Sequence, residues 1–123
     1  MSYRAYTPER GDIIHLNSSP SAGHEMAGRH YALVVSATSY NKRAKMALVC
    51  PITSRVRGWP FEVKVPAGLL PAKRNVGEVS SVIITDAVRQ MDFRQRDAEF
   101  IAKAPKDIVE QVVDMIFATM EPD

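Results

Sequence analysis

A carboxylate, a guanidinium and an imidazole lie within six residues of one another in the segment GHEMAGRHYALVVS, residues 23–36. Glu25, Arg29 and His30 stand where a loop of small and polar residues gives way to an apolar run. A carboxylate or an imidazole can accept a proton, and a guanidinium can hold two oxygens of a phosphate at once. Taken without other evidence, loop charges of this kind are more often simply solvated.

A second polar group follows the next apolar run, in the segment PITSRVRGW at residues 51–59. It carries the hydroxyls of Thr53 and Ser54, the cations of Arg55 and Arg57, and the chain's one tryptophan, Trp59. A hydroxyl at a strand end, with backbone N–H groups beside it, suits a phosphate, and arginines that follow it suit further phosphate contacts. Trp59, flanked by glycine and proline, either packs in a turn or stacks on a base.

Length and composition indicate one globular domain over residues 1–123. The chain is 46% hydrophobic and 24% charged, which is typical of a folded protein. No apolar run reaches the roughly 18 residues of a membrane span, and the N-terminus is too polar for a signal peptide, so we expect a cytoplasmic protein that does not contact membranes. Cys50 lies in an apolar run and is expected to be a buried thiol. No Cys/His spacing resembles a zinc site, so we expect no metal and no cofactor.

The charge is unevenly distributed along the chain. Residues 1–74 carry 11 Lys or Arg against 4 Asp or Glu, a net charge of +7, whereas residues 75–123 carry 5 against 10, a net charge of −5. A basic region favours a polyanionic partner, because neutralising phosphates supplies much of the sequence-independent affinity for nucleic acids.

Hydrophobic patterning predicts a small, twisted, antiparallel β-barrel with a helix at its C-terminal end. Strands are expected at residues 11–16, 31–37, 45–52, 61–65, 78–85 and 87–93. The second and third form a hairpin through the turn-rich connection TSYNKRA, and Phe61, Val63 and Val65 are expected to point inward. From Pro105 the apolar spacing changes to three and four residues, which predicts an amphipathic helix between about residues 105 and 119.

The chain resembles the MazF/PemK toxins of bacterial type II toxin–antitoxin systems in the segments GDIIHL, PSAGHEMAGRHYALVVS, YN, LVCPITSRVRGWPFEV and IITDAVRQMDF. The similarity runs from Gly11 to about Phe93. It implies an SH3-like barrel, a homodimer, and a sequence-specific endoribonuclease that cuts single-stranded mRNA without a metal. It also implies inhibition by a cognate MazE-like antitoxin, expected to be acidic and partly disordered, through which alone the toxin would contact DNA.

Metal-free cleavage of RNA uses the 2′-hydroxyl as an internal nucleophile, so the enzyme must accept a proton, stabilise charge on the phosphate and help the 5′-oxygen leave. The candidate catalytic residues are Glu25, Arg29, His30 and Thr53. Glu25 or His30 would take the proton, Arg29 would stabilise the charge, and Thr53 would offer its hydroxyl. RNA contacts are expected from Asn41, Ser54, Arg55, Arg57, Trp59 and Asp86.

One departure from the family pattern affects the site directly. The family usually shows arginine followed by proline where this chain has His30 and Tyr31, and the arginine of this chain lies one place earlier. Because side chains alternate along a strand, that displacement would point Arg29 away from the site unless the loop compensates. Either Arg29 reaches round or His30 has taken over the position. Similarly, Asp86 matches an acidic position of some relatives, but Ile84 stands where those relatives place an arginine.

Two other functions fit the same fold. One is a gyrase-poison toxin, which acts by binding a protein, and the other is an RNA-binding module that does not cleave. The two polar segments, each with cations and one with hydroxyls, argue against the gyrase poison, which has no use for a group of residues that handles phosphate.

Overall fold

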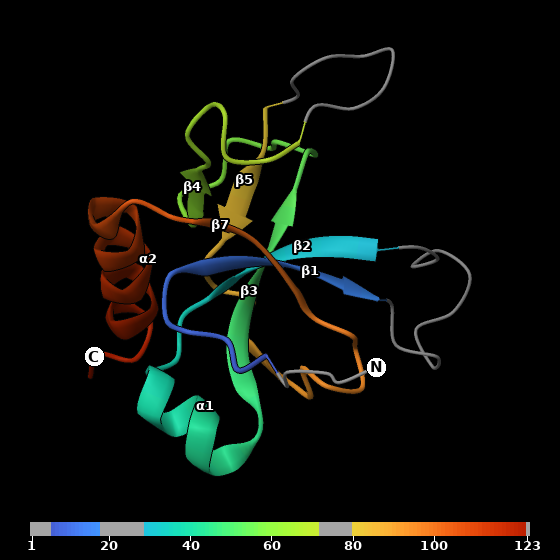
Figure 1. Cartoon of the computed structure of the whole chain (residues 1–123). Helices are drawn as coiled ribbons and strands as arrows, with labels where there is room; N and C mark the ends of the chain where they lie inside the picture. The colour runs from blue at the N-terminus through green and yellow to red at the C-terminus, as the bar shows by residue number, and fades with distance from the viewer. Residues whose placement is uncertain (1–5, 18–28, 72–79, 123) are drawn as a thin grey trace.

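The computed structural model describes residues 6–17, 29–71 and 80–122, with Arg29 described by its backbone alone. The elements follow in the order β1 (Asp12–Asn17), β2 (Arg29–Val34), α1 (Thr38–Ala44), β3 (Ala47–Thr53), β4 (Glu62–Lys64), β5 (Val82–Ile84), β6 (Arg89–Met91), β7 (Glu99–Lys103) and α2 (Lys106–Ala118). Figure 1 shows β1 and β2 running across the direction of β3, with α2 beside the sheet and α1 at one end of it.

The strands form one antiparallel sheet in the order β4-β5-β3-β2-β1-β7. β3 shares one of its edges between two partners: Ala47–Val49 pairs with β6, and Ile52 and Thr53 pair with β5. In the described part of the chain the end strands β4 and β7 do not pair with each other, so the sheet is open and barrel-like rather than closed. This confirms the expected antiparallel β fold with a C-terminal helix.

Both faces of the sheet are buried, because alternate residues of the central strands belong to two separate cores. Ile13, Leu33 and Cys50 point into the first core, which also contains Val63, Val65 and Ile83. Ile14, Val34 and Val49 point into the second, with Met91 and Phe93. A sheet that buries apolar side chains on both faces explains why the central strands are nearly continuous apolar runs in the sequence.

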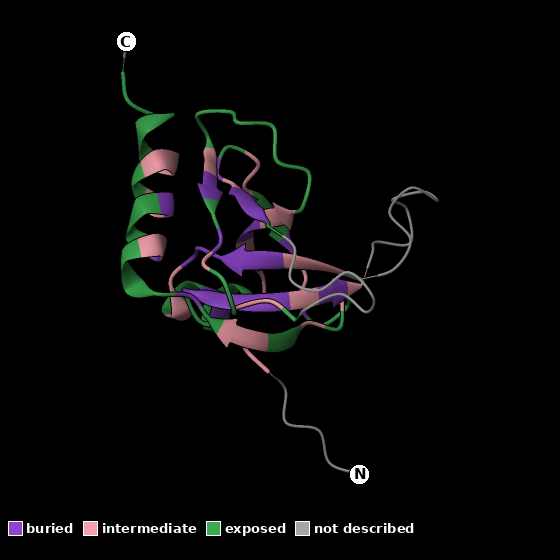
Figure 2. Cartoon of the chain, turned by 90° about the horizontal axis from the view of Figure 1, so that it is seen from above, coloured by how far each residue is buried: buried purple, intermediate pink, exposed green. Residues whose placement is uncertain are grey.

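The C-terminal helix covers the first core. α2 begins after Pro105, whose fixed φ suits a helix start, and Val109 and Val112 are its buried residues. Figure 2 shows the buried and half-buried positions of α2 facing the sheet and the exposed positions facing away. The helix expected from Pro105 onward is therefore confirmed. Neither helix that the structure describes has the length and apolar character needed to cross a membrane.

A buried carboxylate joins β1, β7 and the N-terminal segment. Asp12 accepts hydrogen bonds from the Tyr6 hydroxyl at 2.5 Å, the Glu9 N–H at 3.0 Å and the Lys103 ammonium at 2.7 Å, and we call these residues the Asp12 network. Burial and the bond to Asp12 raise the pKa of Tyr6. Burial alone would lower the pKa of Lys103, but its hydrogen bonds to Asp12 and Glu9 outweigh burial and raise it.

The segment TSYNKRA is a helix, α1, where the sequence predicted a turn. Asn41 is fully buried, and its amide donates to the Pro8 carbonyl at 2.8 Å while its oxygen accepts from the Ser36 hydroxyl. Lys45 ends the helix in the left-handed conformation, with φ 59°. β2 and β3 still pair antiparallel, so the hairpin was predicted correctly and its connection was not.

Two further details of the strand prediction were wrong. Strand β7 was not predicted at all, although it supplies one edge of the sheet. Phe61 lies just before β4 and is 39% exposed, whereas Val63 and Val65 are buried as expected. The alternating pattern therefore identifies the inward face of β4 itself but does not extend back to Phe61.

Candidate functional site

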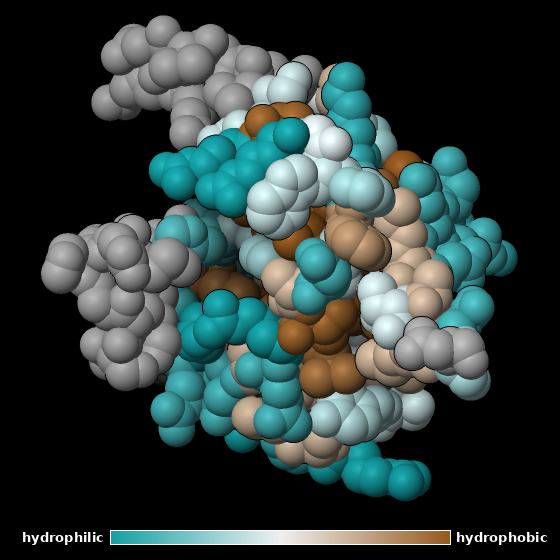
Figure 3. All heavy atoms as spheres, turned by 180° about the vertical axis from the view of Figure 1, so that it is seen from behind, coloured by the Kyte–Doolittle hydropathy of each residue, from teal (hydrophilic) through white to brown (hydrophobic). Residues whose placement is uncertain are grey.

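A groove of about 960 Å³ lies along the sheet between β1, β2, β3 and the turn that follows β3. Apolar residues such as Leu16, Ala32, Val49 and Met91 line part of it. Its arginines are Arg55, Arg57, Arg89 and Arg96, which come from the turn, from β6 and from the segment before β7. The face of the molecule turned away in Figure 1 carries apolar side chains at its centre with hydrophilic ones around them (Figure 3). Such a groove suits an extended anionic chain that also has apolar parts.

His30 and Thr53 both line the groove. His30 pairs with Leu16 of β1, and the next residue of β2, Tyr31, pairs with Ile52 of β3. In an antiparallel pair, the residue before Tyr31 stands beside the residue after Ile52, so His30 and Thr53 are neighbours across the β2–β3 ladder. The sheet thus brings together two of the four predicted catalytic residues.

The position after His30 belongs to the other face of the sheet. Tyr31 stacks on His15, its partner in the β1–β2 pairing, with ring centroids 4.6 Å apart and planes 16° from parallel. Tyr31 also packs against the first core, and part of it lines the groove together with His30.

The Thr53 hydroxyl is positioned by the backbone that follows it. Its Oγ1 accepts a hydrogen bond from the Arg55 N–H at 3.1 Å. With a lone pair used in this way, the hydroxyl hydrogen can be donated to an anionic oxygen in the groove. Ser54 and Arg55 also line the groove, and both are exposed.

Residues 57–62 form a turn that we call the Trp59 turn. The Glu62 carboxylate accepts two backbone N–H groups, from Arg57 to Oε2 at 3.0 Å and from Gly58 to Oε1 at 2.9 Å. Gly58 has φ +75°, a conformation that glycine adopts at little cost. Trp59 is 53% exposed and lines the groove, and the Arg57 guanidinium carbon lies 5.3 Å from the centre of its ring. The indole is therefore not packed in the interior.

The remaining predicted site residues lie elsewhere. The prediction for Asn41 was wrong, because its side chain is fully buried and bonded to Ser36 and Pro8 and cannot reach RNA. Asp86 is exposed in the turn after β5 and does not line the groove. Glu25 lies outside the described residues, and the backbone of Arg29 pairs with Asn17.

Two arginines of the groove were missed by the sequence analysis. Arg89 is exposed on β6, and the Arg96 guanidinium donates to the carbonyl of Asn17 at 3.4 Å. Both belong to the acidic half of the sequence, where nothing local marks them as part of a basic site. Only the pairing of β6 with β3 and the packing of the segment before β7 bring them to the groove.

Cys50 has the structural role that its surroundings predicted. It is fully buried, and its thiol donates to the Thr85 carbonyl with an S···O distance of 3.9 Å. Burial, with a smaller contribution from Asp86, raises the pKa of the thiol to about 12, so the nucleophilic thiolate is not populated near neutral pH. Within the described residues, no three His, Cys, Asp or Glu side chains gather where they could hold a metal ion.

Comparison with known families assigns the chain. The model of the PemK-like, MazF-like toxins of type II toxin–antitoxin systems matches residues 9–118. The chain belongs to this toxin family. The resemblance found in the sequence motifs is thereby confirmed over a longer stretch than the motifs themselves.

Individual family members agree with this assignment. The endoribonuclease toxin ChpB of Escherichia coli (strain K12) is 34% identical over 114 residues, 92% of this chain and 94% of ChpB. The endoribonuclease toxin MazF of the same strain is 33% identical over 93 residues, 76% of each chain. A structure of MazE–MazF from Deinococcus radiodurans superimposes with a TM-score of 0.79 at 38% identity, covering 94% of this chain and 97% of that one. This member of the MazF-like toxins is therefore an endoribonuclease of the same class.

Proposed function

We propose that this endoribonuclease cleaves single-stranded mRNA in the groove, without a metal, by attack of a 2′-hydroxyl on the adjacent phosphate. The 2′-oxygen gives up its proton and bonds to phosphorus as the bond to the 5′-oxygen breaks, and the 5′-oxygen takes up a proton from the imidazolium so formed or from water, which gives a 2′,3′-cyclic phosphate and a 5′-hydroxyl end. The observation that carries the proposal is that an imidazole and a hydroxyl, His30 and Thr53, line one groove with four arginines, each one residue beyond the Tyr31–Ile52 pair of the β2–β3 ladder. Those are the groups that the reaction needs.

The roles follow from the chemistry of each group. His30 takes the proton of the 2′-hydroxyl, because a nitrogen of the neutral imidazole can accept a proton. Thr53 donates its hydroxyl to a phosphate oxygen, since Oγ1 already accepts from the Arg55 N–H. The groove arginines Arg55 and Arg57, with Ser54, hold neighbouring phosphates. Glu25 is the other candidate for taking the proton, and Arg29 is the candidate for stabilising the charge on the phosphate.

The decisive experiment incubates the purified protein with a long unstructured RNA in EDTA. Discrete fragments with 5′-hydroxyl ends are the expected result, and mapping those ends gives the base sequence that is recognised. RNA that is bound but intact would indicate the non-catalytic RNA-binding module, and no interaction at all would favour the gyrase-poison alternative.

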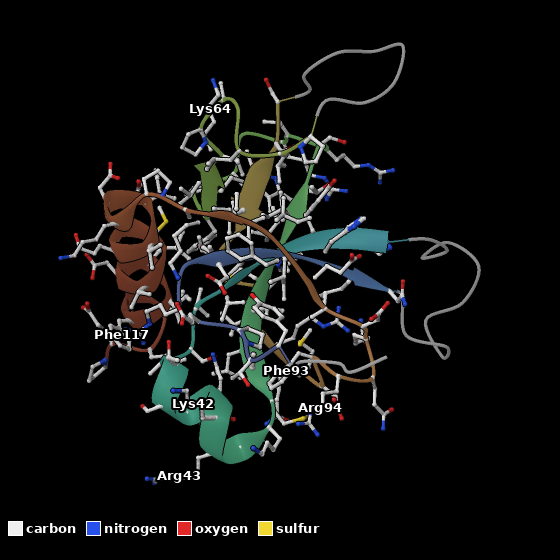
Figure 4. The ribbon with its side chains drawn as sticks, in the orientation of Figure 1. Lys42, Arg43, Lys64, Phe93, Arg94 and Phe117 are labelled. Carbon is white, nitrogen blue, oxygen red and sulfur yellow. The ribbon has the colours of Figure 1, made fainter. Side chains whose placement is uncertain are left out.

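Four variants test the assignment of roles. His30→Ala should slow cleavage by about a hundredfold, in keeping with the loss of a proton-transfer group. Thr53→Val, which keeps the shape but not the hydroxyl, should also slow it. Arg43, which is exposed on α1 and projects away from the molecule (Figure 4), supplies the control Arg43→Ala. If Arg29→Ala slows cleavage and His30→Ala does not, then Arg29 performs the role of the family's arginine although it lies one position earlier in the sequence.

Two partners complete the proposal. A second copy of the chain forms a homodimer, since large apolar side chains are exposed in this structure, among them Phe100 at 52%, Phe117 at 63% and Met120 at 73%. A cognate MazE-like antitoxin, acidic and partly disordered, blocks the groove; the similar structures from Deinococcus radiodurans include complexes of MazE with MazF. DNA is contacted only through that complex. A monomer mass in light scattering, or antitoxin binding that salt does not weaken, would contradict these parts.

A further inference from the structure

The Trp59 turn exposes an aromatic side chain at the edge of an arginine-lined groove. Trp59 is 53% exposed, and its neighbours in the chain, Val56 at 53% and Phe61 at 39%, are exposed as well. An indole is the largest apolar side chain, and leaving half of it in water is unfavourable unless a ligand covers it. Its position on the groove wall indicates that the ligand is whatever occupies the groove.

The backbone of the turn is held by one side chain. Each oxygen of the Glu62 carboxylate accepts one backbone N–H, from Arg57 and from Gly58, and the Glu62 N–H donates to the Trp59 carbonyl at 3.2 Å. These three bonds fix the peptide groups that carry the N–H of Arg57 and of Gly58 and the peptide group that carries the carbonyl of Trp59. A carboxylate is suited to this task because both of its oxygens accept, whereas an amide of the same shape has only one accepting oxygen.

Arg57 and Trp59 together can bind a ligand that has both an aromatic ring and a phosphate. Its guanidinium lies over the Trp59 ring at 5.3 Å, so one face of the indole is in contact with a cation that also lines the groove. The other face can stack on a nucleobase, while the guanidinium binds a phosphate of the same strand. Single-stranded nucleic acids are commonly bound by this combination of stacking and charge.

We propose that Trp59 is a stacking platform for one unpaired base of the RNA, and that Glu62 is the positioning residue that holds the platform against the groove. The proposal rests on the proposed function, because it takes RNA as the occupant of the groove, and it adds a contact for a base beyond the groups that act on the phosphate. Stacking tolerates any base, so the platform strengthens binding without selecting the sequence.

The test uses the fluorescence of Trp59, which is the chain's one tryptophan and therefore reports on this site alone. The probe is a short 2′-O-methyl RNA copied from the long RNA of the cleavage assay, which cannot be cut because its 2′-oxygens are blocked. Binding should quench the emission of the wild-type protein. Trp59→Ala should weaken binding of the same probe, measured by anisotropy of a labelled strand, by about 5- to 100-fold, the range expected for the loss of one stacked base.

Glu62→Gln tests the positioning role. The amide keeps the volume but turns one acceptor into a donor that faces a backbone N–H, so KM should rise about tenfold with kcat changed by less than about threefold. The Trp59 emission of the free protein should also shift. Glu110→Gln, the same change at an exposed position of α2, is the matched control and should alter none of these quantities.

The outcomes separate the platform from the cleavage reaction. If the probe binds without quenching Trp59, or if Trp59→Ala binds as tightly as the wild type, the platform is wrong even when the wild type cleaves RNA. If the probe quenches Trp59 and no RNA is ever cleaved, the platform stands and the proposed reaction fails. If Glu62→Gln lowers only the melting temperature and leaves KM and emission unchanged, Glu62 is a structural residue and not a positioning one.

Discussion

Asn41 offers the sharpest test of how the fold is held together. Its side chain is fully buried, donates to the Pro8 carbonyl at 2.8 Å and accepts from the Ser36 hydroxyl, whose oxygen in turn accepts the Leu48 N–H at 2.9 Å. The residue thus links α1, the N-terminal segment and the start of β3. Asn41→Ala removes the amide and leaves the buried Pro8 carbonyl without this donor.

The expected loss can be worked out from these contacts. Two hydrogen bonds contribute about 1 kcal/mol each, and a buried carbonyl that loses its donor costs about 1 kcal/mol more, so the free energy of unfolding should fall by about 3 kcal/mol. An unfolding entropy of about 2.1 cal/mol/K per residue gives about 0.26 kcal/mol/K for this chain. The melting temperature should therefore fall by about 12 °C.

The assay follows thermal unfolding by circular dichroism at one protein concentration. Lys42→Ala, an exposed change on the same helix, is the control and should stay within about 0.5 kcal/mol of the wild type. Below its melting temperature, Asn41→Ala should cleave RNA at nearly the wild-type rate. If cleavage is lost while the melting temperature is unchanged, Asn41 contacts RNA and the structural role assigned to it is wrong.

Three further outcomes are expected. Gly11→Ala should cost about 2 kcal/mol in urea unfolding, because φ is +94° and a new Cβ would lie 3.3 Å from Val109; Gly68→Ala, with φ +87° and open space around it, should cost less, and equal costs would contradict the contact. The Asp12 network and Cys50 contain groups with raised pKa values, so the native state keeps protons that the unfolded state loses. Stability should be full below about pH 8.5, fall above it as the Cys50 thiol of the unfolded chain ionises, and fall more steeply above about pH 10, where Tyr6 adds its share, by about 1.4 kcal/mol per pH unit for each of these two groups; a urea midpoint that is constant to about pH 11 would be inconsistent with these shifts. A thiol reagent should label Cys50 at least about 100-fold more slowly in the native protein than in urea, and rapid native labelling would show that the site is open.

The sequence predicted those parts of the fold that depend on local pattern. The apolar runs around Leu33 and Cys50 predict central strands, and the spacing of apolar residues after Pro105 predicts α2, because a buried face produces a regular spacing of apolar residues in the sequence. The segment that forms α1 shows no such spacing. It is seven residues long, lacks a capping side chain and is held by Asn41 through bonds to distant residues, which no local signal reveals.

The candidate site divides in the same way. Which face of the sheet a side chain of β2 takes changes with every residue. The sequence motifs therefore predicted His30 and Thr53 as site residues, and the one-residue displacement of Arg29 left its orientation open. Arg89 and Arg96 could not be found, since they reach the groove through β6 and the segment before β7, which pair or pack at long range. The sequence therefore predicted the candidate catalytic residues His30 and Thr53 but not the groove arginines Arg89 and Arg96.

Glu62 stabilises the Trp59 turn through backbone groups, so the residues that shape the turn differ from the side chains that can contact RNA. The carboxylate bonds to backbone N–H groups, which every residue except proline possesses, and not to the side chains that face the groove. Substitutions at Arg55, Arg57 or Trp59 can therefore accumulate during evolution without loss of the turn, provided that Gly58 and Glu62 remain. Toxins built on this scaffold can diverge in how tightly they hold RNA while the barrel stays the same, and an engineered change of RNA affinity should start from these three positions.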